Sequence, residues 1–330
     1  MRSGTAAGHE GYYHEAALYG SDDEFLSVVV PFLEDGLAAG EPTLAAFAPH
    51  NEALVRGALP GGGRGITFLA GSEQYRNPAT SIKRYRDTVA RHVAEGAAQV
   101  RITGDVPHPG TGTPWDWWAR YEAAANHAFA DLPLWGLCPY DTRTAPAAVL
   151  ADVERTHPHL ATPGGARHAN SAYEDPVTFL AGHEPAFADP VEGQNPDVAL
   201  GAPTAQSARR AVAEAGARTR LSRGEIDDLV LAVSEVVSNG IRHGVPPVEL
   251  RLWTAPDRVV VTVTDRGKGP GDPLAGLVPA RPDSAEGGLG LWIAHQLCSY
   301  VTLHRSGTGT FTVRLVAGQP SAPLVSGQRG

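Results

Sequence analysis

Residues 222–244, SRGEIDDLVLAVSEVVSNGIRHG, predict one long amphipathic helix. Ser222 and Glu225 have the S-x-x-E spacing of a capping box, in which two side chains satisfy backbone amides at the start of a helix. His243 and Gly244, followed by a proline at position 246, form a helix stop signal. This helix anchors the interpretation of the C-terminal part of the chain.

Three polar residues of this helix, Glu235, Asn239 and His243, follow one another at intervals of four and therefore share one stripe of its surface. The stripe combines a carboxylate, an amide and an imidazole. The alternative for any one of them is an ordinary place on the solvated face of the helix. The residues expected to face the core are Val233, Val236, Val237 and Ile241.

The residues that follow predict an α+β sandwich. Residues 248–253 and 258–264 alternate as two strands joined by a turn, residues 290–299 predict a helix, and residues 300–304 and 310–316 predict a closing hairpin. Helices on one face of a mostly antiparallel sheet are the arrangement that this order favours.

Two glycine-rich loops interrupt these elements. The first, DRGKG at 265–269, directly follows the apolar strand VVVTVT, and Asp265 can accept a hydrogen bond from an amino group such as that of adenine. The second, EGGLGL at 286–291, opens a helix whose first amides can bind phosphate oxygens. Taken singly, the first could be a plain loop and the second a flexible hinge.

The order of these motifs resembles the GHKL class of ATP-binding folds over about residues 205–316. Within that class it resembles the anti-sigma-factor serine kinases of bacteria most, through EIDDLVLAVSEVVSNGIRHG, VTVTDRGKGP and GGLGLWIAHQL. Four motifs in register make the resemblance specific. It implies a domain that binds ATP together with Mg²⁺.

The resemblance also implies a role for each matching residue. Glu235 would be the general base toward a serine or threonine hydroxyl of a partner, and Asn239 would ligate Mg²⁺. Asp265 would hydrogen-bond adenine, and His243 would orient the phosphates or the lid, or else cap the helix. The remaining residues implied to bind ATP are Gly267, Gly269, Gly287, Gly288, Gly290, Leu291 and Thr310.

By resemblance the chain would be a regulator of transcription that binds a sigma factor and an anti-anti-sigma (STAS) protein and phosphorylates the latter. Pairing of two chains into a homodimer through this domain is a further possibility. One alternative is a module that binds ATP and sequesters its partner without phosphate transfer. A second is a histidine-kinase-like fragment, which is disfavoured because no helical hairpin with a phosphorylatable histidine precedes residue 205.

The N-terminal residues predict a different fold class, an α/β domain with a parallel sheet and helices on both faces. Residues 9–161 resemble the MEDS sensory domain of methanogen and methylotroph regulators, through HEAALYGSDDEFLSVVVPFLEDGLAAGEPTLAAF, RYEAAANHAF and LCPYD. The resemblance implies a RecA-like fold. Because GGGRG at 61–65 lacks the GK[ST] of a P-loop, we do not expect ATP hydrolysis here. The expected strands are 42–47, 65–69, 99–102 and 132–140, and the expected helices are 25–40, 75–96 and 114–130.

The candidate sensory residues are the polar members of the resembling segments: His14, Glu122, Cys138, Tyr140 and Asp141. Cys138 or His14 could bind a metal ion or meet an oxidant, and the alternative is a set of polar groups hydrogen-bonded within a core. His157 and His159 form an H-x-H that we expect in a surface turn, because the sequence shows no third ligand nearby.

Composition and charge agree with two soluble domains. Hydrophobic residues make up 42% of the 330 positions and charged residues 19%, which excludes wholesale disorder. The net charge of −9 argues against direct nucleic-acid binding. It divides into −12 for residues 1–200 and +3 for residues 201–330. With no apolar run near the length of a membrane helix and no export signal, we expect a cytoplasmic protein without membrane contact.

The expected division of the chain places the seam in a stretch rich in proline and glycine. The expected parts are a MEDS-like sensory domain at 1–165, a linker at 166–204, the ATP-binding domain at 205–317 and a frayed tail at 318–330.

Overall fold

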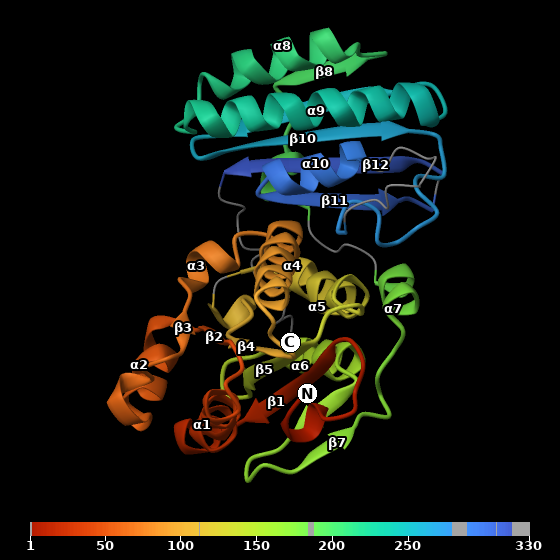
Figure 1. The fold of residues 1–330 in the computed structure, drawn as a ribbon. Helices are drawn as coiled ribbons and strands as arrows, with labels where there is room; N and C mark the ends of the chain where they lie inside the picture. The colour runs from red at the N-terminus through yellow and green to blue at the C-terminus, as the bar shows by residue number, and fades with distance from the viewer. Residues whose placement is uncertain (1, 112, 184–187, 279–288, 308, 319–330) are drawn as a thin grey trace, which may run out of the picture. The chain divides into compact units, whose positions relative to one another are not determined.

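The computed structural model describes residues 2–111, 113–183, 188–278, 289–307 and 309–318. The chain forms two compact units, Met1–Gly182 and His183–Gly330 (Figure 1). Each unit has its own sheet, and each is described by itself below.

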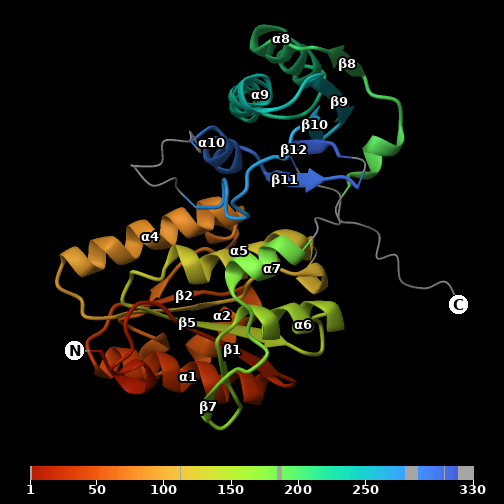
Figure 2. The ribbon, with the colours of Figure 1, turned by 90° about the vertical axis from the view of Figure 1, so that its right-hand side faces the viewer.

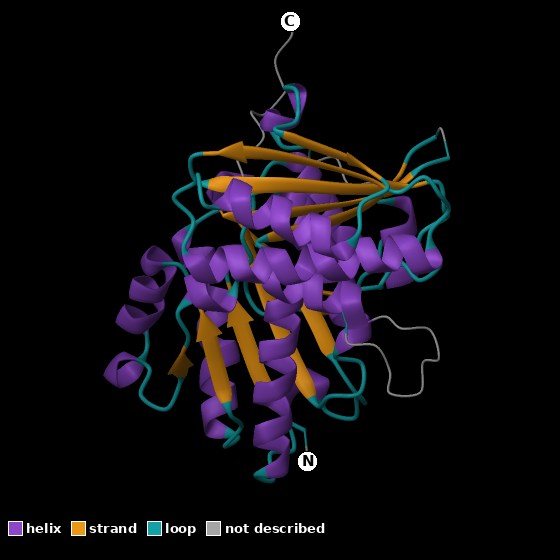
Figure 3. Cartoon of the chain, turned by 90° about the horizontal axis from the view of Figure 1, so that it is seen from above, coloured by secondary structure: helices purple, strands orange, loops and turns teal. Residues whose placement is uncertain are grey.

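The first unit is built on a seven-stranded sheet in the order β3-β2-β4-β5-β1-β6-β7. Its strands pair in parallel except for β6 with β7, which pair antiparallel, and the parallel arrows point the same way in Figure 3. The strands are β1 (Tyr13–Tyr19), β2 (Thr43–Ala46), β3 (Thr67–Phe68), β4 (Val100–Gly104), β5 (Leu134–Asp141), β6 (His159–Ala161) and β7 (Arg167–Ala169).

Helices cover both faces of this sheet, as the parallel α/β pattern predicted (Figure 2). On one face, α1 and α2 enclose a core that includes Phe25, Phe32 and the strand residue Trp135. Helices α4 and α5 cover the other face together with α6 and α7. The helices are α1 (Asp22–Ala38), α2 (Pro49–Ala58), α3 (Gly71–Gln74), α4 (Pro78–Ala94), α5 (Trp115–Ala128), α6 (Ala147–Thr156) and α7 (Pro176–Gly182), with short 3₁₀ turns η1 (Gly4–Ala6), η2 (Pro60–Gly62) and η3 (Pro109–Thr111).

The segment 166–204, expected as a linker, contributes elements to both units. Its first part forms β7 and α7 of the first unit, where Arg167 donates to the buried carboxylate of Glu15 at 3.0 Å. Its last part forms η4 (Pro190–Gly193) and β8 (Val198–Gly201) of the second unit. There Asp189 is 1% exposed and pairs with Arg258 at 2.8 Å.

A buried arginine connects the first sheet to neighbouring segments through an ion pair and hydrogen bonds. The side chain of Arg101 on β4 is fully buried, and its Nε donates to Glu41 at 2.6 Å. Its other nitrogens donate to the carbonyl of Phe32 and to the hydroxyl of Ser3, each at 2.8 Å. The guanidinium carbon lies 4.4 Å from the centre of the Trp135 ring.

We expect Arg101→Met to destabilise this unit by about 3–5 kcal/mol, because the substitution leaves the nearly buried carboxylate of Glu41 without its cation. Urea unfolding followed by tryptophan fluorescence measures the loss. Arg143→Met is the matched control, since Arg143 is 45% exposed and pairs with Asp22 and Asp141 at the surface. It should cost far less, because solvent screens an exposed ion pair. Equal losses in the two variants would contradict the role of burial.

The second unit is a five-stranded antiparallel sheet in the order β11-β12-β10-β9-β8. Three helices lie on one face (Figure 2) and enclose the core with the inward side chains of the strands. This confirms the α+β sandwich. Besides β8, the elements are α8 (Ala205–Gly216), α9 (Arg223–His243), β9 (Glu249–Ala255), β10 (Arg258–Asp265), α10 (Leu289–Leu297), β11 (Tyr300–Arg305) and β12 (Phe311–Gly318).

Helix α9 begins as its capping box predicted, with Ser222 and Glu225 each bonded to the other's backbone amide. The predicted core residues Val233, Val236 and Val237 are buried, each with at most 2% exposure. The prediction for Ile241 is wrong, because its side chain is 55% exposed in the last turn of the helix.

Candidate functional site

The carboxylate of Asp265, at the end of β10, connects the C-terminal end of α9 to the first glycine loop. Its Oδ1 accepts hydrogen bonds from the amides of Gly267 at 2.5 Å and Val245 at 3.2 Å. Asp265 is 6% exposed. Both hydrogen bonds that reach this carboxylate from the described residues end on Oδ1, so Oδ2 keeps its capacity to accept another.

Two glycines leave bare backbone beside this carboxylate. A methyl group at Gly244 would lie 2.8 Å from Oδ2 of Asp265, and one at Gly267 would lie 2.6 Å from Oδ1. Gly269 has a φ of 67° and packs closely on the ring of Phe311, where a Cβ would lie only 2.4 Å from a ring carbon. The backbone at these glycines therefore approaches the carboxylate and the Phe311 ring more closely than a residue with a Cβ would allow.

At the start of α10, the structure brings together Glu235 and Asn239 of α9 with Gly290. A methyl group at Gly290 would lie 2.9 Å from Asn239 Nδ2 and 3.1 Å from Glu235 Oε2. Both side chains therefore extend over the first turn of α10, which also contains Leu291. The first amides of a helix have no partner within it and can bind anions.

The other residues implied to bind ATP are His243, Thr310, Gly287 and Gly288. His243 is exposed in the last turn of α9. The hydroxyl of Thr310 lies 2.8 Å from that of Ser306 in the turn between β11 and β12. Gly287 and Gly288 lie outside the described residues.

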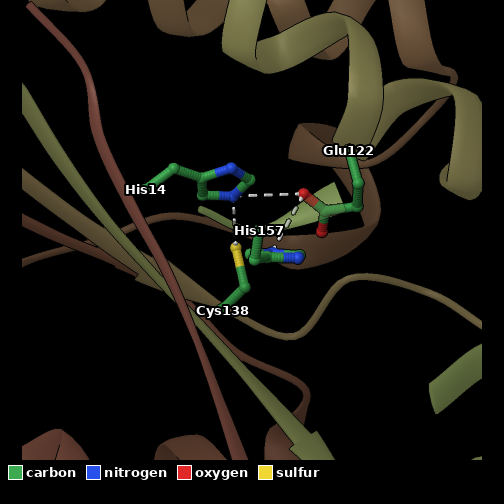
Figure 4. Close-up of side chains that lie close together, drawn as sticks. All are labelled: His14, Glu122, Cys138 and His157. Carbon is green, nitrogen blue, oxygen red and sulfur yellow. Dashed lines mark hydrogen bonds and ion pairs between the residues drawn. The ribbon is translucent and has the colours of Figure 1, made fainter. Parts of the chain in front are cut away.

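In the first unit, four polar residues from distant parts of the sequence meet in the interior (Figure 4). His14 comes from β1, Glu122 from α5, Cys138 from β5 and His157 from the end of α6. His14 Nε2 lies 3.3 Å from Glu122 Oε2 and 3.5 Å from Cys138 Sγ. His157 Nε2 lies 3.6 Å from the same oxygen of Glu122.

The comparisons with known proteins assign both units. Residues 13–158 match the family model described as MEDS, the methanogen/methylotroph DcmR sensory domain. Residues 200–316 match the model described as a histidine kinase-like ATPase domain. The chain joins a MEDS domain to a histidine kinase-like ATPase domain. The two domain resemblances drawn from the sequence are thereby confirmed.

Solved structures similar to the chain include the RsbU and RsbW domains of Rv1364c from Mycobacterium tuberculosis. That likeness has 23% identity and a TM-score of 0.26, and it covers 38% of this chain and 32% of that one. This chain thus spans about a third of the mycobacterial chain's length. The histidine kinase domain of the E. coli osmosensor EnvZ is 20% identical with a TM-score of 0.24, over 42% of this chain and 95% of that one. A search of curated proteins found no match.

In the MEDS domain, three of the five candidate sensory residues, His14, Glu122 and Cys138, belong to the buried cluster. Tyr140 donates its hydroxyl to Glu122 Oε1 at 2.5 Å and so supports it from outside. Asp141 lies apart, paired with Arg143 at the surface.

The expectation for the H-x-H pair of the MEDS domain is wrong. His157 is fully buried and lies against the other three members of the cluster, which are of residue types that can ligate a metal and come from distant parts of the sequence. His159 is partly buried in β6, where its ring stacks on that of Tyr13. A histidine directly after a helix and before a short strand gave no local sign of burial, because its neighbours come from β1, α5 and β5.

Burial disfavours the charged forms in this cluster of the MEDS domain. It lowers the pKa of His14 and of His157 to about 3. It raises the pKa of the Glu122 carboxyl, and burial together with Glu122 raises the pKa of the Cys138 thiol well above its ordinary value.

Cys138 also borders a small cavity of the MEDS domain. This cavity has a volume of about 20 Å³ and is lined in part by Tyr12, Tyr75, Tyr85 and Tyr121. Tyr12 stacks on His14 with 4.7 Å between ring centroids. A space of this size holds one water molecule or a ligand of similar size.

None of the helices that the structure describes has the length and apolar character needed to cross a membrane.

Proposed function

We propose that the chain is a regulator of transcription that binds Mg-ATP in its histidine kinase-like ATPase domain and controls a sigma factor by partner switching. The observation that supports this most is the meeting of Glu235 and Asn239 over the start of α10. A carboxylate, a neutral oxygen ligand and unpartnered helix amides are the groups that phosphate transfer from ATP needs.

Nucleotide binding is divided between two positions in the C-terminal half of α9. At its C-terminal end, Oδ2 of Asp265 accepts a hydrogen bond from the amino group of adenine, beside the bare backbone of Gly244 and Gly267. About one turn before that end, Asn239 would hold Mg²⁺, which neutralises phosphate charge when bound. The first amides of α10, with Gly290 and Leu291, face the phosphates.

For phosphate transfer, Glu235 acts as the general base. The oxygen of a serine or threonine hydroxyl on the partner attacks the γ-phosphorus, and the bond from that phosphorus to the ADP oxygen breaks. The hydroxyl proton passes to Glu235. One helical turn separates this carboxylate from Asn239, so the base lies within reach of the terminal phosphate.

The proposed partners are a sigma factor and an anti-anti-sigma STAS protein. The domain holds one or the other, and phosphorylation of the STAS protein returns the sigma factor to the domain. The MEDS domain supplies the signal. An ATP-binding module that sequesters its partner without phosphate transfer would share the same nucleotide contacts but would not need Glu235 as a base.

Calorimetric titration of the full chain with Mg-ATP tests the first step, and incorporation of the γ-phosphate into a STAS-domain partner tests the second. Saturable binding with phosphate incorporation supports the kinase. Binding without incorporation supports the non-catalytic module. Absence of binding would overturn the proposal.

We expect Gly290→Ala to fold normally but to weaken Mg-ATP binding and phosphate transfer, each by about 10-fold or more. The closest atoms to the added methyl are the tips of two side chains, Asn239 and Glu235, which can move away, and the next, Glu235 Cβ, lies at an ordinary 3.5 Å. Their displacement by a few tenths of an ångström disturbs both functional groups. Calorimetry and phosphate incorporation measure the two effects.

Gly201→Ala is the matched control for this variant, since a Cβ there meets no atom within 4 Å. Normal binding and transfer by Gly290→Ala would show that Glu235 and Asn239 do not act from these positions.

A further inference from the structure

The hydrogen bonds within the buried cluster of the MEDS domain are incomplete. Glu122 Oε2 and His157 Nε2 are buried and have no hydrogen-bond partner among the described residues. Glu122 Oε2 nevertheless faces His157 Nε2 at 3.6 Å and His14 Nε2 at 3.3 Å. Burying polar atoms without hydrogen-bond partners costs free energy. A bound ion or a proton shared between them would reduce that cost.

The outer hydrogen bonds determine which histidine nitrogens face inward with a lone pair. His157 Nδ1 lies 2.8 Å from the carbonyl of Val153, so Nδ1 carries the proton. Asn126 donates its amide nitrogen to two carbonyls, those of Glu122 and Thr156. Its oxygen therefore faces His14 Nδ1 at 3.0 Å and accepts a hydrogen bond from it. In both rings Nε2 is left as an acceptor.

Three acceptor atoms thus point at one another, and the sulfur of Cys138 is the fourth neighbour. A proton on Glu122 could reach only one histidine, and 3.6 Å is too long for an O–H···N hydrogen bond to His157. A cation between the four atoms would satisfy all of them.

We propose that His14, Glu122, Cys138 and His157 bind one divalent transition-metal ion, with Zn²⁺ the ion that this set of ligands favours. Two imidazoles, one thiolate and one carboxylate form a nitrogen, sulfur and oxygen set typical of zinc and unlike the all-oxygen sites of Ca²⁺ or Mg²⁺. The two negative ligands balance the charge of a divalent ion. Protons held by Cys138 and Glu122 pass to solvent as the metal binds.

The distances already match such a site. The four ligand atoms lie within 4.8 Å of one another. In a tetrahedron around zinc, neighbouring nitrogen or oxygen ligands are about 3.3 Å apart and a nitrogen and a sulfur about 3.5 Å apart. The separations of 3.3 Å from His14 to Glu122 and 3.5 Å from His14 to Cys138 agree with these edges.

The outer hydrogen bonds complete the design of a metal site. Val153, Asn126 and the Tyr140 hydroxyl each orient one ligand, the pattern by which proteins fix imidazole and carboxylate ligands. The ligands come from β1, α5, β5 and the end of α6, so one ion would join four segments of the domain. Cys138 also borders the tyrosine-lined cavity, which places a metal-bound sulfur beside the space for a small molecule.

The test uses the full chain, stripped of metal by a chelator and titrated with Co²⁺ and then Zn²⁺. We expect one Co²⁺ per chain, with the intense visible bands of tetrahedral cobalt and the charge-transfer band of a cobalt–thiolate bond. Zn²⁺ should remove both signals. Absence of a thiolate band in the wild-type chain would overturn the proposal without any variant.

Variants assign the ligands. Cys138→Ser should lose the thiolate band, and His157→Gln should lower the affinity for Co²⁺ by more than about 100-fold, beyond the usual effect of an outer partner. The matched controls are Cys298→Ser, which removes the buried thiol of the ATPase domain, and His159→Gln. Both should keep the wild-type spectrum. A thiolate band that disappears with Cys298 and persists without Cys138 would contradict the site.

Discussion

The Glu235→Gln variant is expected to lose phosphate transfer to a STAS-domain partner by about 10²–10⁴-fold while its affinity for Mg-ATP changes little. The amide cannot accept the hydroxyl proton, so the general-base contribution disappears. Its shape is nearly that of the carboxylate, and the position beside Gly290 stays filled. Phosphate incorporation under single-turnover conditions and calorimetric titration measure the two quantities.

Glu214→Gln provides the matched control, because it makes the same change at an exposed carboxylate on α8, whose side chain is 72% exposed. It should transfer phosphate as the wild type does. Normal transfer by Glu235→Gln would show that another group removes the proton or that transfer needs no base. Loss of ATP affinity in the same variant would instead assign the carboxylate to nucleotide binding.

The Asp265→Asn variant is expected to weaken Mg-ATP binding by about 10–100-fold, the free energy of one hydrogen bond to a charged acceptor. The asparagine oxygen can still accept from the amides of Gly267 and Val245, so the end of α9 stays attached. Its Nδ2 then presents a donor where the adenine amino group also donates. Guanine has a carbonyl at that position, so the preference for ATP over GTP should narrow.

Titration of both nucleotides into the same preparations checks this prediction. Asp257→Asn is the matched control, because it makes the same change next to the other end of β10, where the side chain is 47% exposed. It should leave both affinities unchanged. Equal weakening of ATP and GTP by Asp265→Asn would indicate damage to the loop, and unchanged ATP affinity would remove Asp265 from the adenine contact.

The ATPase domain was largely predictable because its signals are local. A capping box, a stop signal and two glycine loops are each read from a few neighbouring residues, and the structure places α9, β10 and α10 where they were expected. Strand β8 and helix α8 were not read from pattern. The four residues of β8 alternate only between partial and full exposure, so they lack the contrast that marks a strand.

The MEDS domain contains features that a local sequence pattern could not predict. Its interior strand β1 has the sequence YHEAALY, whose alanines, leucine and glutamate suit a helix as well as a strand. Burial between β5 and β6 decides the matter, and Glu15 within it is satisfied by Trp135 and Arg167 from far along the chain. The buried cluster is likewise assembled from segments up to 143 positions apart, from His14 to His157.

The shared position of Glu235 and Asn239 over Gly290 has a consequence for control. In the proposed function, two tasks, holding the nucleotide's phosphates and removing the partner's proton, would depend on one short helix of nine residues. A small rotation or slide of α10 would alter both tasks at once. The affinity for ATP and the rate of phosphate transfer would therefore increase or decrease together. Signals that reach this helix would therefore act as a switch, with no state that binds ATP fully yet transfers phosphate poorly.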